Sequence, residues 1–177
     1  MNLTEKTLKK IYKFKGRILN VRQDEVEAPD GSIVSREVIE HNGGVCIAAV
    51  TDENELLLVR QFRYPLMKEI IEVPAGKLEP GENPLHCATR ELLEETGFTA
   101  QKIELLDQMY PSPGYSAENI YIFKATGLQY KQQQLDEGEF LDVIKLPLEE
   151  AYRQVLSNEI ADGKTQIAVL RLFCQKA

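Results

Sequence analysis

Three glutamates at helical spacing form the group in the sequence that is best suited to bind a metal ion. Glu91, Glu94 and Glu95 stand at i, i+3 and i+4, so a helix would present their carboxylates on one face. Like charges at this spacing destabilise a helix by roughly 0.2–0.5 kcal/mol per pair. A hard divalent cation such as Mg²⁺ would offset that repulsion, because it prefers carboxylate oxygens and accepts phosphate oxygens as further ligands. The alternative is an ordinary solvated glutamate-rich helix face.

The helix that must carry these glutamates has clear ends. Asn83 is a good N-cap residue, and Pro84 suits the first helical position, where its missing N–H costs nothing. Gly97 suits the C′ position, where a left-handed residue closes the last turn. Apolar residues at helical spacing give the helix a face to bury (Leu85, Ala88 and Leu92). We therefore predict a helix between Asn83 and Gly97.

The residues around this helix form a longer pattern. Residues 76–98 read G-x5-E-x7-R-E-L-x-E-E-x-G-F, with the defined polar and glycine positions at Gly76, Glu82, Arg90, Glu91, Glu94, Glu95 and Gly97. Seven positions demand one residue type each, at a background frequency of about 5–7%, so a chance match is on the order of 10⁻⁷. The pattern resembles the signature of the Nudix hydrolases at every defined position.

The resemblance implies metal-dependent hydrolysis of the diphosphate bridge in a nucleoside diphosphate linked to another group. Two or three Mg²⁺ or Mn²⁺ ions would be held by Glu91 and Glu95, with Glu94 close by and the Ala75 carbonyl as a backbone ligand. Arg90 would hold the glutamates in place, and Glu82 would assist it. The catalytic residues implied in this way are Glu95, Arg90 and, from a later acidic stretch, Glu137.

Other stretches resemble the ADP-ribose pyrophosphatase branch of the family. In VRQFRYP, residues 59–65, Arg63 would reach the substrate, although an arginine in a surface ion pair is the alternative. In SPGYSAE, residues 112–118, the alternative is an ordinary Pro-Gly loop. The resemblance extends to an arginine of the N-terminal segment that would meet the adenine end from a partner subunit. The substrate-binding residues it implies are Arg36, Arg63, Glu72, Pro113, Gly114 and Glu118.

The acidic stretch LDEGEF, residues 135–140, resembles a late loop of the same branch. The glutamates of the helix would be occupied by cations, so a carboxylate from elsewhere must orient or deprotonate the attacking water. The resemblance suggests Glu137 as the base and Glu139 as a further metal ligand, and it leaves the assignment of the base between these two open. Gly138 would leave the loop mobile. A solvated acidic turn is the alternative.

Three functions are consistent with these residues. The first is hydrolysis of ADP-ribose, or a related nucleoside diphosphate sugar, with AMP and ribose 5-phosphate as the products of ADP-ribose. The second is a pyrophosphatase for another nucleotide sugar such as GDP-mannose. The third is a ligand-sensing Nudix domain without catalysis, which the intact signature disfavours.

The composition limits the other possibilities. The chain has 177 residues and a formal net charge of −7, which argues against a nucleic-acid partner. The N-terminus lacks the apolar core of a signal peptide, and the longest apolar run, residues 45–50, is too short to cross a membrane. Three widely spaced cysteines suggest free thiols in a reducing compartment. We therefore expect a cytoplasmic enzyme.

The order of apolar runs and turns predicts an α+β fold, with a mixed β-sheet sandwiched between helices and a small N-terminal β-rich subdomain. We expect that subdomain to span residues 1–42 and the Nudix hydrolase domain to span residues 43–177. Within the first, residues 12–21, 24–28 and 32–39 read as strands, with a turn at Pro29-Asp30-Gly31. The resemblance implies a homodimer formed through this subdomain.

Three further predictions concern the second domain. Residues 45–50 and 55–62 read as two strands of a hairpin. Two helices are expected near residues 148–158 and 164–175. Gly163-Lys164-Thr165 looks like the end of a phosphate-binding P-loop, but the earlier glycine that the motif requires would fall on Asn158, so we reject it.

Overall fold

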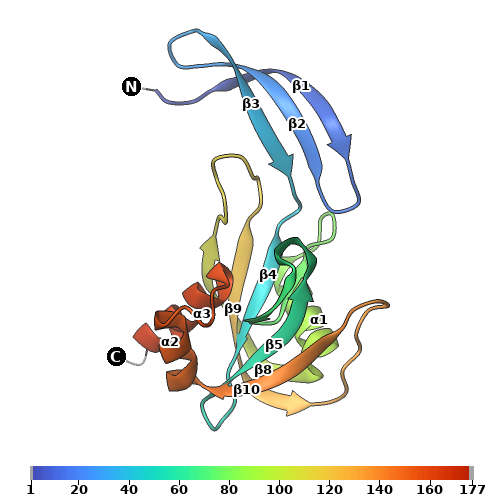
Figure 1. The fold of residues 1–177 in the computed structure, drawn as a ribbon, viewed down its shortest axis with the longest axis vertical. Helices are drawn as coiled ribbons and strands as arrows, with labels where there is room; N and C mark the ends of the chain where they lie inside the picture. The colour runs from blue at the N-terminus through green and yellow to red at the C-terminus, as the bar shows by residue number, and fades with distance from the viewer. Residues whose placement is uncertain (1, 176–177) are drawn as a thin grey trace. The chain divides into compact units, whose positions relative to one another are not determined.

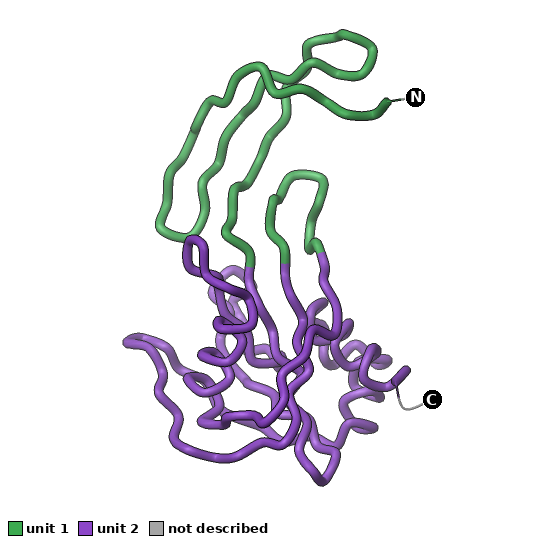
Figure 2. Tube along the Cα trace, turned by 180° about the vertical axis from the view of Figure 1, so that it is seen from behind, with its two compact units in different colours: residues 1–43, 110–119 green, residues 44–109, 120–177 purple. Residues whose placement is uncertain are grey.

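The computed structural model describes residues 2–175, and the chain divides into two compact units. The small unit comprises Met1–Gly43 and Tyr110–Asn119, and the large unit comprises Gly44–Met109 and Ile120–Ala177. Figure 1 labels the strands and helices, and Figure 2 colours the two units. The predicted boundary between two domains at residues 42 and 43 stays a prediction. The sequence analysis did not predict that residues 110–119 group with the small unit.

The small unit is built on one antiparallel sheet. Its strands β1 (Lys6–Lys15), β2 (Asn20–Glu27) and β3 (Ile33–Glu40) lie in that order (Figure 1). The predicted first strand was wrong in its bounds, because Gly16 ends it and its N–H donates to the Leu19 carbonyl at 3.0 Å. The predicted turn is confirmed, since Gly31 has a φ of 83° and donates to the Ala28 carbonyl at 2.9 Å.

The segment Tyr110–Asn119 is fastened to β3 by backbone hydrogen bonds. The N–H of Ile39 donates to the Tyr115 carbonyl at 2.7 Å, and the N–H of Ala117 donates to the Ile39 carbonyl at 2.9 Å. These two bonds make a short parallel bridge between Ile39 and Ser116. The Pro-Gly loop is therefore ordered against the small sheet.

The large unit contains two further sheets. In one, strands β7 (Ala75–Lys77), β4 (Gly44–Ala49), β9 (Ile120–Tyr130) and β8 (Phe98–Met109) lie in that order, with β4 and β9 parallel. The other has the order β10 (Leu141–Pro147), β5 (Glu55–Arg63) and β6 (Lys68–Glu72), all antiparallel. A short 3₁₀ turn, Tyr64–Leu66, follows β5, and the helices are α1 (Pro84–Thr96), α2 (Leu148–Leu156) and α3 (Gly163–Cys174).

The predicted hairpin of residues 45–50 and 55–62 was wrong. The two strands exist, but β4 and β5 belong to different sheets, and within the described chain only an isolated bridge between Val50 and Leu56 pairs them. β4 and the first half of β5, residues 56–59, are buried runs that are apolar on both faces, so they carry no alternation that would fix a pairing partner.

The predicted mixed sheet between helices is confirmed by the way β4 packs. Val45 and Ile47 belong to a buried cluster with Cys87, Ala88 and Leu92 of α1. The alternate residues, Cys46 and Ala48, belong to a second cluster with residues of α2 and α3. The helices thus cover both faces of the sheet (Figure 1).

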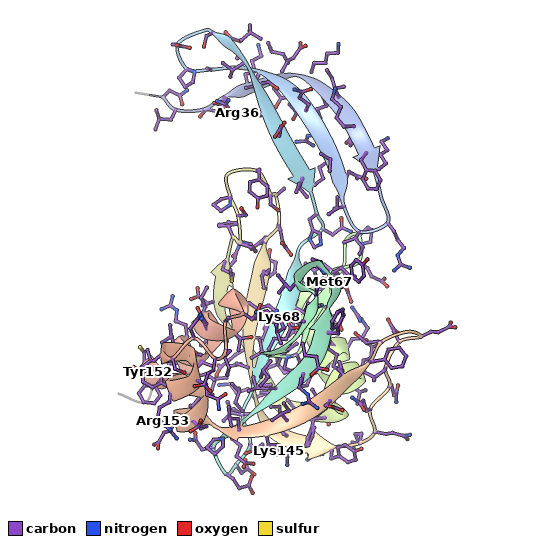
Figure 3. All side chains as sticks on the ribbon, in the orientation of Figure 1. Arg36, Met67, Lys68, Lys145, Tyr152 and Arg153 are labelled. Atoms are coloured by element: carbon purple, nitrogen blue, oxygen red, sulfur yellow. The ribbon has the colours of Figure 1, made fainter. Side chains whose placement is uncertain are left out.

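The two C-terminal helices are fastened to each other. Tyr152 of α2, labelled in Figure 3, stacks on Phe173 of α3 with ring centroids 3.9 Å apart.

Within residues 2–175, no helix is long and apolar enough to cross a membrane.

Candidate active site

The signature helix forms as its capping residues predict. The Asn83 side chain accepts hydrogen bonds from the N–H groups of Leu85 and His86 at 2.9 and 3.4 Å. At the other end, Gly97 has a φ of 75° and donates to the Leu93 carbonyl at 2.8 Å. These two caps fix where the helix begins and ends, and hence the face on which its glutamates lie.

Arg90 binds three of the signature carboxylates at once. Its Nη1 lies 2.7 Å from Glu91 Oε1 and 2.8 Å from Glu94 Oε2, and its Nε lies 3.3 Å from Glu82 Oε1. Burial disfavours its charge, but hydrogen bonds to these carboxylates raise the pKa of Arg90. Arg90 therefore holds the loop before α1 and the acidic face of α1 in one arrangement.

Glu82 is fixed from a second direction. Its Oε2 accepts the N–H of Glu79 at 2.9 Å, within the loop that leads from β7 into α1. Partial burial would raise the pKa of Glu82, but this backbone hydrogen bond and Arg90 outweigh burial and lower it. Glu82 is thus an ionised brace between the loop and Arg90.

Glu95 is the buried carboxylate of the site. Its residue is 2% exposed, and its Oε2 accepts the N–H of Ala75 at 2.8 Å. Burial raises the pKa of Glu95 to about 8, with further contributions from the carboxylates of Glu91, Glu139 and Glu72, while the Ala75 N–H opposes the shift. A carboxylate in this position gains free energy from a proton or from a cation.

Glu91 lies over β7. An ideal Cβ built on Gly76 would overlap the carboxylate of Glu91, so a glycine is needed for that carboxylate to occupy its position. Burial raises the pKa of Glu91, and the charges of Glu94 and Glu139 add to the shift, although Arg90 opposes it. Glu91 and Glu95 therefore both lie at the junction of β7 and α1.

The segment before the late acidic loop is fastened to the end of α1. The side chain of Gln133 donates to the Glu95 carbonyl at 2.6 Å, and the N–H of Gln134 donates to the Glu94 carbonyl at 3.0 Å. Gly97 allows this close approach, because a Cβ there would lie 2.7 Å from the Gln133 nitrogen. These carbonyls at the helix end are thereby satisfied.

The two candidate glutamates of the late loop differ in their surroundings. The charge of Glu139 contributes to the raised pKa values of both Glu91 and Glu95. Glu137 is exposed, and among residues 2–175 no hydrogen bond or ion pair holds its side chain. Gly138 between them has a φ of 83°, which glycine adopts readily.

The donor set suits a hard divalent cation. Glu91, Glu95 and Glu139 offer carboxylate oxygens, and β7 brings the Ala75 backbone beside them. In the described part of the chain, no three His, Cys, Asp or Glu side chains converge on one point as a finished metal site. Arg90 Nη1 binds both Glu91 and Glu94. The residues fit the ion chemically, and the ligand set stays a prediction.

A second ionic cluster contains residues that the sequence analysis did not connect. Glu72 is fully buried on β6, and Arg63 of β5 binds both of its oxygens, at 2.6 and 2.9 Å. Lys164 at the start of α3 also binds Glu72, and it lies 3.0 Å from Asp162. The only local signal for this cluster was Asp162, a good N-cap residue before an expected helix.

The remaining predicted substrate-binding residues lie in the small unit. Arg36, labelled on β3 in Figure 3, is exposed and forms an ion pair with Glu5. Pro113 and Gly114 belong to the loop fastened to β3, and Glu118 Oε1 lies 3.6 Å from Nδ1 of His41. The twelve other predicted residues belong to the large unit (Arg63, Glu72, Ala75, Gly76, Glu82, Arg90, Glu91, Glu94, Glu95, Gly97, Glu137 and Glu139).

Comparison with protein families matches residues 40–167 to the NUDIX domain and residues 5–39 to the nucleoside diphosphate sugar hydrolase N-terminal domain. The chain belongs to the Nudix family. The sequence prediction of that family is therefore confirmed, and the matched regions include the signature helix, both ionic clusters and the late loop.

Individual known proteins match nearly the full length of the chain. An ADP-ribose pyrophosphatase of Bacillus subtilis (strain 168) is 42% identical over 178 residues, covering 99% of this chain and 96% of that protein. A methanol dehydrogenase activator of Bacillus methanolicus is 45% identical over 175 residues, covering 98% and 95%. A crystal structure of an ADP compounds hydrolase aligns with a TM-score of 0.84 at 23% identity, covering 97% and 94%, and shows the same fold.

Proposed function

We propose that this Nudix protein hydrolyses the diphosphate bond of ADP-ribose, giving AMP and ribose 5-phosphate, with Mg²⁺ or Mn²⁺ as cofactor. The observation that carries the proposal is the placement of Glu91 and Glu95 at the β7–α1 junction, where Glu95 accepts the Ala75 N–H at 2.8 Å and burial raises the pKa values of both carboxyls. The near full-length similarity to an ADP-ribose pyrophosphatase supports the choice of substrate.

The chain's own residues would divide the work as follows. Glu91, Glu95 and Glu139, with Glu94 and the Ala75 carbonyl, would hold two or three divalent ions. Bound there, the ions would neutralise diphosphate oxygens and acidify the attacking water. Arg90 keeps the carboxylates in position by binding Glu82, Glu91 and Glu94.

Two further side chains complete the proposed mechanism. Glu137 is solvent-exposed on a loop with a glycine next to it, so its carboxylate is available to orient the water or take its proton. Arg63 keeps N–H groups that Glu72 does not use and would bind the substrate's diphosphate. In the small unit, Arg36, Pro113, Gly114 and Glu118 would contact the nucleoside end.

The assembly is part of the proposal. We expect residues 1–42 to act as a dimerisation subdomain and residues 43–177 as the catalytic domain of a cytoplasmic homodimer. Within the small unit, β1 is exposed along almost its whole length, and Phe14 on it is 58% exposed. A sheet of this size has too little core of its own, so a second copy would supply the missing cover.

The experiment that tests this function is a substrate panel with product identification. Purified protein with Mg²⁺ is incubated with ADP-ribose, GDP-mannose, other nucleotide sugars, dinucleoside polyphosphates and nucleoside triphosphates. We expect ADP-ribose to have the highest kcat/KM, with AMP and ribose 5-phosphate as products. A higher kcat/KM for GDP-mannose would establish the alternative substrate, and tight binding without turnover of any compound would establish the ligand-sensing alternative.

A further inference from the structure

The buried carboxylate of Glu72 is shared between two cations from distant parts of the chain. Arg63 binds both oxygens through Nε and Nη2, at 2.6 and 2.9 Å. Lys164 of α3, which is 92 positions from Glu72 in the sequence, binds Oε2. With Asp162 at 3.0 Å from Lys164, the cluster contains two positive and two negative groups. It is therefore close to neutral, which a buried ionic cluster requires.

Glu72 leaves part of Arg63 unoccupied. A guanidinium has five N–H donors, and Glu72 uses Nε–H and one N–H of Nη2. No other group within residues 2–175 accepts a hydrogen bond from Arg63, and its side chain is 39% exposed. Arg63 thus presents both N–H groups of Nη1 and one of Nη2 for an anionic ligand, while Glu72 prevents the side chain from rotating.

Side-chain hydrogen bonds hold the first turn of α3, which carries Lys164, in place. Asp162 caps the helix, its Oδ2 accepting from the N–H and the hydroxyl of Thr165 at 3.0 and 2.6 Å. The same hydroxyl accepts a hydrogen bond from the N–H of Val73 at 2.9 Å. Val73 directly follows Glu72 in the chain. The segment Gly163-Lys164-Thr165, which does not form a P-loop, therefore links α3 to the end of β6, the strand that carries Glu72.

We propose that Lys164 is a positioning residue for substrate binding, which anchors the buried carboxylate of Glu72 and thereby holds Arg63 with its free N–H groups toward the substrate's diphosphate. Lys164 does not touch the substrate in this arrangement. The inference rests on the proposed function, because it assigns the C-terminal helix a role in binding the same diphosphate.

Loss of Lys164 should displace Arg63 without removing it. Glu72 would then have one cation in place of two, and Arg63 would be drawn further toward the buried carboxylate to compensate for the missing charge. We expect Lys164→Met to weaken ligand binding about tenfold, the scale of one charge-assisted hydrogen bond. The chemical step should be affected less, so KM should rise while kcat stays within about threefold.

The decisive measurement is a double-mutant cycle on ligand affinity. Binding of a non-hydrolysable ADP-ribose analogue, in which a methylene group replaces the bridging oxygen of the diphosphate, is measured by calorimetry with Mg²⁺ for wild type, Lys164→Met, Arg63→Met and the double variant. We expect both single variants to bind more weakly and the double variant to bind no more weakly than Arg63→Met. Lys102→Met, which breaks an exposed lysine–carboxylate pair with Glu104 on β8, is the matched control and should bind like wild type.

Two more variants separate positioning from general stability. Lys164→Arg keeps the charge and should restore binding to within about threefold of wild type. If Lys164→Met does not fold, as judged by circular dichroism, Glu72→Gln removes the charge that Lys164 neutralises and should weaken binding through Arg63 in the same non-additive way. Additive losses in the cycle, or wild-type affinity of a folded Lys164→Met variant, would overturn the proposal.

Failure of the proposed function has a different signature. If the wild-type protein turns over another nucleotide sugar and not ADP-ribose, the substrate assignment fails, and the same cycle run with that nucleotide sugar decides the role of Lys164. If the wild type turns over no diphosphate compound and does not bind the analogue with Mg²⁺, both proposals fail together.

Discussion

The carboxylate of Glu91 fills the space in which a side chain on residue 76 would begin. β7 and α1 approach each other so closely there that the absence of a Cβ at Gly76 is what lets Glu91 lie beside Ala75 and the buried Glu95. The glycine therefore serves the acidic site by leaving room, and its backbone does not need a positive φ.

We expect Gly76→Ala to impair the site more than the fold. The new Cβ would displace the Glu91 carboxylate, and a misplacement of about 1 Å in such a site can cost about 10²-fold in rate. Overpacking of this kind typically costs about 1–3 kcal/mol in the free energy of unfolding. Kinetics at several Mg²⁺ concentrations and urea denaturation would measure the two effects.

The matched control for this variant is Gly163→Ala. A Cβ at Gly163 meets no atom within 4 Å, and its φ is not positive. It should leave both kcat and the unfolding free energy close to wild type. An unchanged Mg²⁺ requirement in Gly76→Ala would show that Glu91 is not held where the metal binds.

Local signals predicted the signature helix correctly and the ionic cluster behind it poorly. Asn83, Pro84 and Gly97 are cap residues whose effect is local, so the sequence alone was enough to place α1. The pairing of Glu72 with Lys164 joins residues 92 positions apart, and no pattern in either stretch indicates the other. The pairing of β4 with β9 was hidden for a similar reason, because strands buried on both faces show no alternation.

Removal of divalent cations should abolish turnover and lower stability. EDTA should stop hydrolysis, and added Mg²⁺ or Mn²⁺ should restore it, because the clustered carboxylates otherwise repel the diphosphate. A ligand at about 100 times its Kd stabilises the folded state by about 2.7 kcal/mol. For a domain of this size, that corresponds to a Tm increase of roughly 5–11 °C, which a thermal melt can measure. Full activity in metal-free buffer would refute the proposed mechanism.

Glu95→Gln should separate activity from stability. With a pKa of about 8, Glu95 in the metal-free protein at neutral pH is largely protonated, and glutamine resembles that form. The amide oxygen can still accept the Ala75 N–H, so the Tm in EDTA should equal or exceed that of wild type. The Tm increase on adding Mg²⁺ should be lost, and kcat should fall by several orders of magnitude. A loss below tenfold would mean that Glu95 is not a principal metal ligand.

The two glutamates of the late loop should give different kinetic phenotypes. Glu137→Gln should lower kcat by about 10²–10⁴-fold with KM little changed, as expected for removal of a general base. Glu139→Gln should raise the Mg²⁺ concentration needed for activity, because Glu139 contributes to the charge around Glu91 and Glu95. The exposed Glu149 of α2 offers a control, Glu149→Gln, which should behave as wild type. Wild-type kcat in both loop variants at saturating Mg²⁺ would place the base within the signature helix.

The protein should be a homodimer, and its small sheet should be the surface that pairs. β1 is an edge strand with Tyr12 and Phe14 exposed, which is a liability unless another chain covers it. Sedimentation at micromolar concentration should give a dimer, and Tyr12→Asp with Phe14→Asp should shift it toward monomer. Leu156→Asp, at an exposed leucine of α2, is the matched control and should remain dimeric.

Dimer formation should also matter for turnover if, as we propose, Arg36 contacts a substrate bound by the other subunit. Dilution of the wild type below the dimer dissociation constant should then lower kcat/KM, and Arg36→Ala should lower it at concentrations where the protein is dimeric, without changing the dissociation constant. The ion pair of Arg36 with Glu5 is exposed and worth little, so its loss should leave the melting temperature nearly unchanged. A fully active monomer at micromolar concentration would contradict both the pairing surface and the assignment of Arg36.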